Sequence, residues 1–162
     1  MIHVSTFKAA MASFPSGVVI ATTLDGEGKP WGFTASSFAS VSLDPPLVLV
    51  CLAKSAECHA AFAATGLFAV NILAGDGEAV ARRFATRGAR KFIGDELVVG
   101  EQGLPTVSGA AAVLVCRKFA HYDGGDHSIM VGEVQSVNHE PARDAMIYFR
   151  RKFWRFSTPP TE

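Results

Sequence analysis

The feature that most constrains the fold is a pair of long apolar segments joined by a turn near the C-terminal end of the chain. Residues 111–121 and 128–138 are rich in Val, Ile and Leu, and the turn signal Asp-Gly-Gly-Asp at 123–126 lies between them. A connection this short joins antiparallel strands, because parallel strands need a long crossover. The chain is therefore expected to build an antiparallel sheet.

The remaining segments predict mostly strands, with few helices. The regular alternation of strands and helices that a doubly wound α/β fold requires is absent. A closed antiparallel barrel with helical insertions fits best, because closure removes the edges of the sheet. Strands are expected at 18–23, 31–36, 47–52, 67–73 and 147–156, helices at 6–14, 55–64 and 78–86, a hairpin turn at 25–28 and irregular chain at 95–108.

Length and composition predict one soluble domain over residues 1–162. Apolar residues make up 49% and charged residues 19%, which excludes wholesale disorder. Fifteen basic and fifteen acidic side chains give zero net charge, so no global field directs the chain to nucleic acid or to an acidic membrane.

The cysteines and the N-terminus predict a cytoplasmic location. Cys51, Cys58 and Cys116 are an odd number without metal-ligand spacing, which favours buried thiols in a reducing compartment. The first residues lack the pattern of a secretory signal. The longest apolar run, at 47–53, is far below the ~20 residues that span a bilayer.

No classical catalytic set is evident, and three segments remain as candidates for a site. The first, at 32–38, holds Thr34, Ser36 and Ser37 around Ala35. Three hydroxyls in four residues can offer hydroxyl and backbone donors to a flat polar ligand. The alternative is a bulged, serine-rich end of a strand.

The second segment, at 52–57, is where a buried strand is expected to end and a helix to begin. Free N–H groups, a capping Ser55 and the adjacent Lys54 would make an anion site, and the alternative is an ordinary helix cap. Further on, five basic side chains occur in ten residues. They suit either a neighbouring phosphate or a solvated helix face, and they are Arg82, Arg83, Arg87, Arg90 and Lys91.

The third segment places His127 directly after the turn at 123–126. Glycines in this turn let the backbone pass close to a ligand. The imidazole can stack on a ring or donate a hydrogen bond, whereas Asp126 is expected mainly to shape the turn. The alternative is an ordinary surface histidine.

Six pieces of the sequence, in order, resemble the flavin reductase family with the FMN-binding split-barrel fold, the reductase components of two-component flavin-dependent monooxygenases. Each piece is weak alone, and together they cover nearly the whole chain. They are Phe-Pro-Ser-Gly-Val at 14–18, Gly-Phe-Thr-Ala-Ser-Ser-Phe at 32–38, Ser-Val-Ser-Leu-Asp-Pro-Pro-Leu-Val at 40–48, Phe-Ala-Val-Asn-Ile-Leu at 68–73, Gly-Asp-His-Ser-Ile-Met-Val-Gly-Glu-Val at 125–134 and Tyr-Phe-Arg-Arg at 148–151.

The resemblance implies a mainly β, antiparallel Greek-key split β-barrel with a few peripheral helices. It implies hydride transfer from NADH or NADPH to FMN or FAD, a homodimer with flavin near the subunit interface, and a partner oxygenase that receives reduced flavin. It implies that Thr34, Ala35, Ser36 and Ser37 lie along the flavin ring and ribityl chain, that Ala53, Lys54, Ser55, Phe84, Ala85, Arg90 and Lys91 lie towards its phosphate, and that His127, Tyr148 and Arg151 meet the nicotinamide nucleotide.

The C-terminal piece departs from the family pattern. Relatives often have Tyr-Arg-Gly where this chain has Tyr148 followed by Phe149, Arg150 and Arg151. Tyr148 and Arg151 are three residues apart, so a regular strand would place them on opposite faces. Both can meet one ligand only if a bulge or the end of the strand redirects one of them.

Positioning two rings for hydride transfer needs no catalytic side chain and no metal, which agrees with the missing catalytic set. One alternative is a flavin-binding electron carrier or sensor of the same fold without a nicotinamide site. A second is a single-stranded nucleic-acid binder, since basic and aromatic residues alternate at 147–156. The sequence alone does not choose between FMN and FAD or between NADH and NADPH.

Overall fold

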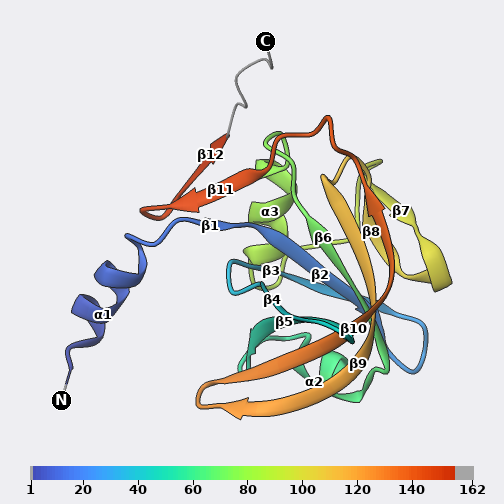
Figure 1. Cartoon of the computed structure of the whole chain (residues 1–162), viewed down its shortest axis with the longest axis horizontal. Helices are drawn as coiled ribbons and strands as arrows, with labels where there is room; N and C mark the ends of the chain where they lie inside the picture. Colours follow the sequence, from blue (N-terminus) through green and yellow to red (C-terminus); the bar gives the residue numbers. More distant parts are fainter. Residues whose placement is uncertain (1, 156–162) are drawn as a thin grey trace.

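A computed structural model describes residues 2–155, and an antiparallel seven-stranded sheet dominates it (Figure 1). The two long predicted strands are present and pair with each other around the predicted turn. The sheet order is β3-β2-β6-β9-β10-β5-β4. These strands are β2 (Val19–Leu24), β3 (Pro30–Ala35), β4 (Ala39–Leu43), β5 (Pro46–Ala53), β6 (Leu67–Ile72), β9 (Ala112–Gly124) and β10 (His127–His139).

The sheet curls into a barrel because its two edge strands are consecutive in the chain. β3 ends at Ala35 and β4 begins at Ala39, a stretch that reaches at most about 15 Å. The edge strands of a flat sheet of this order would lie about 29 Å apart. β3 and β4 are not hydrogen-bonded to each other, so the barrel stays split at this seam. The predicted mainly β, antiparallel split barrel is therefore confirmed.

The core lies on both sides of the barrel wall. Inside, Phe62 is fully buried and packs edge-to-face with Phe33, with 5.1 Å between the ring centroids. Outside, Phe84 and neighbouring apolar side chains pack against the other face of β2. Strand β2 is buried on both faces, including Thr22 and Thr23, which explains why its sequence lacks the alternation of a half-exposed strand.

In the described part of the chain, three α-helices accompany the sheet: α1 (Val4–Met11), α2 (His59–Ala64) and α3 (Glu78–Ala85). Helix α1 extends away from the barrel in Figure 1 and has no buried residue. Helix α3 buries Val80, Ala81 and Phe84 against the barrel, as the apolar spacing predicts. Among residues 2–155, no helix is long and apolar enough to cross a membrane.

Helix α2 begins four residues later than predicted. The chain at 53–59 forms successive turns, in which the Ala56 N–H donates to Ala53 O and the His59 N–H to Ala56 O. The Lys54 N–H donates to Asp126 O, so this residue is still tied to the neighbouring hairpin. Ser55 therefore caps no helix, and the prediction of a helix start at this residue was wrong.

The predicted final strand at 147–156 was also wrong, because the chain reverses within it. Arg150 and Arg151 have φ angles of 50° and 62° and form a turn. They separate β11 (Met146–Phe149) from β12 (Lys152–Arg155), and both join β1 (Ser16–Gly17) in a small sheet beside the barrel. Phe156, the last residue of the predicted strand, lies outside the described residues.

Besides the two-residue β1, three further strands and a short helix of the described residues were missed. The strand β4 is mostly exposed, so it lacks the apolar run that marks a buried strand. Within the segment predicted to be irregular, two three-residue strands pair around a 3₁₀ turn. These elements are too short to show a period in the sequence. They are β7 (Leu97–Val99), η1 (Glu101–Gly103) and β8 (Pro105–Val107).

Candidate active site

A cavity of about 970 Å³ opens at the end of the barrel where β3 and β5 finish. Its walls come from the chain after β3, the turn at 53–58, the loop at 86–91 and the tip of the β9–β10 hairpin. All three segments selected from the sequence therefore meet at one place. The volume suits a ligand of cofactor size.

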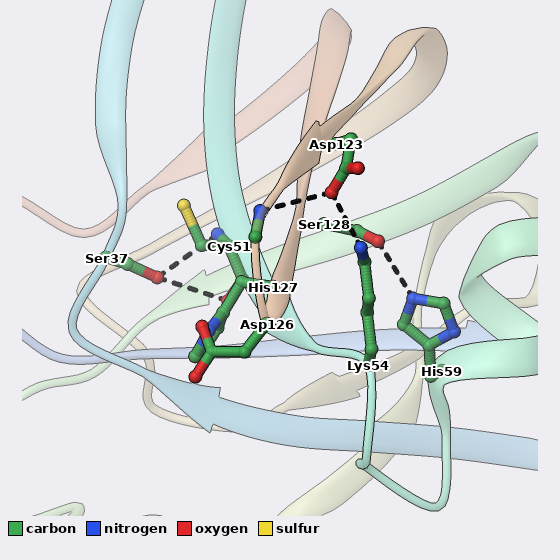
Figure 2. Close-up of polar contacts among 9 residues, drawn as sticks. Ser37, Cys51, Lys54, His59, Asp123, Asp126, His127 and Ser128 are labelled. Atoms are coloured by element: carbon green, nitrogen blue, oxygen red, sulfur yellow. Dashed lines mark hydrogen bonds and ion pairs between the residues drawn. The ribbon is translucent and has the colours of Figure 1, made fainter.

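The strand β3 and the residues after it form one wall of the cavity. Thr34, Ala35, Ser36 and Ser37 all line it, as the family resemblance implies. Two of the three hydroxyls have structural partners. Thr34 Oγ1 donates to Ala81 O at 2.6 Å, and Ser37 Oγ accepts the Cys51 N–H at 3.1 Å and donates to Cys51 O at 3.2 Å (Figure 2). The Ser37 contacts hold the seam of the barrel together.

Gly32 allows the cavity wall to lie against helix α3. A Cβ at this position would lie 2.7 Å from Phe84 Cε1 and 2.9 Å from Ala21 O. Phe84 is almost fully buried and the second neighbour is backbone, so neither can move cheaply. The absence of a side chain at Gly32 is therefore a packing requirement of this wall.

Lys54 does not line the cavity. Its Nζ lies 2.6 Å from Asp123 Oδ1, and the same carboxylate accepts the Gly125 N–H at 3.1 Å (Figure 2). These contacts hold the pKa of Asp123 below its usual value, with the Lys54 hydrogen bond as the largest cause. Lys54 thus fastens the turn after β5 to the hairpin tip, while its neighbours Ala53 and Ser55 do line the cavity.

The loop at 86–91 forms the basic wall. Phe84, Ala85, Arg87 and Lys91 line the cavity, whereas Arg90 does not. Lys91 Nζ donates to Thr86 O at 2.8 Å, and Arg87 Nη1 donates to Ser55 O at 3.3 Å. The five basic residues therefore do not act together. Arg82 and Arg83 of α3 pair with Glu78 and Glu96 instead.

Glu57 connects the two loops across this wall. Its Oε2 accepts the Gly88 N–H at 3.1 Å and lies 3.8 Å from Lys91 Nζ. The Gly88 hydrogen bond is the largest cause that lowers the pKa of Glu57, and the charges of Lys91 and Arg87 add to it. The carboxylate is therefore ionised at neutral pH.

His127 lines the cavity from the hairpin side, at the first position of β10. Its Nδ1 lies 2.7 Å from Asp126 Oδ1. The hydrogen bond to His127 is the largest cause that lowers the pKa of Asp126. Asp126 therefore orients the imidazole directly, in addition to its place in the turn.

Tyr148 and Arg151 do not join these residues within one chain. Tyr148 lies on β11 opposite Ser16, and its ring contacts Phe153 at 5.3 Å between centroids. Arg151 lies in the turn between β11 and β12. Neither lines the cavity.

Many lining residues were not selected as site residues from the sequence, among them Trp31 and three with ionisable groups. Trp31 stands at the rim, where its Nε1 donates to Asp25 Oδ2 at 2.8 Å and Lys29 lies over its ring. Trp31 could have been found from its position two residues before Phe33, because this spacing places both side chains on the same face of the strand. The others are Glu57, Arg87 and the buried thiol of Cys58, whose pKa burial raises to about 11.

Comparisons with known proteins show which family the chain resembles. Residues 11–157 match the family model described as flavin reductase like domain. The actinorhodin polyketide dimerase of Streptomyces coelicolor is 46% identical over 146 residues, which cover 90% of this chain and 82% of that protein.

Two solved structures have the same fold. The NADH:FAD oxidoreductase of Streptomyces globisporus, in complex with NAD and FAD fragments, superposes with a TM-score of 0.90 and 39% identity, covering 97% of this chain and 94% of that one. The flavin reductase component of a bacterial two-component tryptophan halogenase gives a TM-score of 0.89 with 34% identity, covering 97% and 100%. With its family model, its relatives and its fold in agreement, the chain belongs to the flavin reductase like family.

Proposed function

We propose that this protein is an NADH- or NADPH-dependent flavin reductase that transfers a hydride to FMN or FAD. The observation that carries the proposal is the cavity itself, which joins a hydroxyl-bearing strand end, a basic loop and His127 in one space of about 970 Å³. Membership of the flavin reductase like family supports the same assignment.

The residues present fit a flavin. The wall at 34–37 would hold the ring system and ribityl chain, because it combines a flat strand with exposed polar groups beside apolar side chains. The phosphate would lie between the turn at 53–58 and the loop at 86–91, close to Ser55 and Lys91. Lys54 and Arg90, which the resemblance also placed there, contribute to this end only from outside the cavity lining.

A bound flavin supplies the hydride acceptor, and the protein's part is to hold the two rings face to face. His127 is held by Asp126 and is aimed into the cavity from the hairpin, so we assign it to positioning the nicotinamide nucleotide. Backbone N–H groups near 34–37 would stabilise charge that develops on the acceptor. Tyr148 and Arg151 can take part only across a subunit interface, because neither lines the cavity of its own chain.

We further propose a homodimer that delivers reduced flavin to a separate oxygenase component. The apolar side chains of α1, with Val4, Phe7 and Met11 more than half exposed, support an additional interface. The halogenase reductase supports the division of labour between two components. The thiols Cys51, Cys58 and Cys116 are free, which suits the proposed cytoplasmic location.

The test is to mix the protein with FMN or FAD and with NADH or NADPH, and to follow absorbance of the reduced nicotinamide. Flavin-dependent consumption of at least one nicotinamide is expected. The alternative is a flavin-binding carrier or sensor of the same fold. Flavin binding without consumption of either nicotinamide would establish that alternative and refute the reductase.

A further inference from the structure

The wall expected to meet the flavin phosphate already holds a carboxylate of the protein. Glu57 carries the single carboxylate among the described residues that line the cavity. Arg87 and Lys91 line the same cavity, so an anionic ligand would be expected here. A fixed negative charge at this position opposes the binding of a phosphate.

The groups around Glu57 are those that bind phosphates in proteins: a backbone N–H and basic side chains. The Gly88 N–H donates to Glu57 Oε2 at 3.1 Å, and Lys91 Nζ lies 3.8 Å from the same oxygen. The side chain of Lys91 is only 15% exposed, so few other conformations are open to it. The carboxylate thus satisfies donors that a phosphate would otherwise use.

Glu57 can leave this position without disturbing the core. Its side chain is 40% exposed, and its ion pair and hydrogen bond are with Lys91 and the Gly88 N–H of the loop at 86–91. The two loops remain joined without it, because Arg87 Nη1 still donates to Ser55 O across them. Lys91 also keeps its hydrogen bond to Thr86 O within the loop at 86–91. An exchange between the carboxylate and an incoming phosphate therefore needs only a rotation of one surface side chain.

We propose that Glu57 is an internal competitor of the flavin phosphate and weakens the binding of FMN relative to riboflavin. This inference rests on the proposed function, because it needs a flavin in the cavity. If the carboxylate leaves the donors open for about one tenth of the time, the apparent dissociation constant of FMN rises about tenfold. A loosely held phosphate suits a protein that must hand its reduced flavin to a partner.

The test is to titrate FMN and riboflavin against the wild type, Glu57→Gln and Glu78→Gln by flavin fluorescence. Glutamine keeps an acceptor for the Gly88 N–H and removes only the charge. We expect Glu57→Gln to tighten FMN about tenfold and to leave riboflavin unchanged. Glu78 pairs with Arg82 outside the cavity, so Glu78→Gln matches the change in net charge and should move neither constant.

Unchanged or weaker FMN binding in Glu57→Gln would overturn the proposal, as would equal tightening of both flavins. Glu57→Ala is the second variant and should also lower the dissociation constant of FMN. The wild type is also assayed for NADH oxidation with each flavin. If the wild type reduces both flavins but Glu57→Gln leaves the ratio of the FMN and riboflavin dissociation constants unchanged, only the role of Glu57 is refuted. If NADH is oxidised with neither flavin, the proposed function is refuted.

Discussion

The two sides of the cavity are built in different ways. The side at 32–37 is part of the barrel, and core side chains and ladder hydrogen bonds hold it in place. The side formed by the loops at 53–58 and 86–91 is held by contacts of exposed charged groups, such as Glu57 with the Gly88 N–H. The strand side can therefore shape a rigid surface for rings, while the loop side can exchange its partners.

The largest expected effect comes from the strand side. Gly32→Ala would place a methyl group against Phe84 and Ala21 O, both within 3 Å. Overpacking of this kind costs about 1–3 kcal/mol of unfolding free energy. Urea denaturation measures it. Gly26→Ala is the matched control, since nothing lies within 4 Å of its Cβ, and equal effects of the two variants would show that Gly32 is not a packing requirement.

A smaller effect is expected from Lys54→Met, which removes the link between the turn after β5 and the hairpin. Both partners are substantially exposed, so the stability of the fold should fall only slightly. The hairpin tip carries His127, so the Michaelis constant for NADH should rise while the dissociation constant of FMN stays the same. Loss of FMN binding with unchanged NADH kinetics would instead place Lys54 at the phosphate.

The smallest effect is on the acid stability of the loop side. The pKa of Glu57 is lowered in the folded protein, so its contribution is present above the unfolded value near 4.5 and is lost as the pH falls through the lower folded value. The urea midpoint should therefore decrease between pH 5 and pH 3, and it should decrease less in Glu57→Gln. An identical pH dependence in the two proteins would contradict the assigned contacts.

The strand side was predictable from the sequence and the loop side was not. A buried strand such as β5 carries a continuous apolar run, so its position follows from hydrophobic burial alone. The loop contacts join residues about thirty positions apart, as with Glu57 and Gly88, and no local pattern announces them. The helix start predicted at Ser55 is an example. A helix-cap signal was present, but hydrogen bonding to the hairpin holds this segment outside the helix.

The C-terminal hairpin was likewise not predictable from the local sequence. Residues 147–155 have the composition of one strand, yet Arg150 and Arg151 adopt left-handed backbone angles that few side chains favour. Pairing of β11 with both β1 and β12 outweighs that local cost. The proposed roles of Tyr148 and Arg151 would therefore require the proposed second subunit, which the sequence of one chain does not place.

The most direct test of the account is the kinetics of His127→Ala. The central claim is that the strand and loop sides hold the flavin, while the hairpin presents His127 to the nicotinamide. With saturating FMN, the variant should show a higher Michaelis constant for NADH or slower hydride transfer, with an unchanged dissociation constant for FMN. A variant that loses FMN and keeps wild-type NADH kinetics when excess FMN is supplied would contradict the claim.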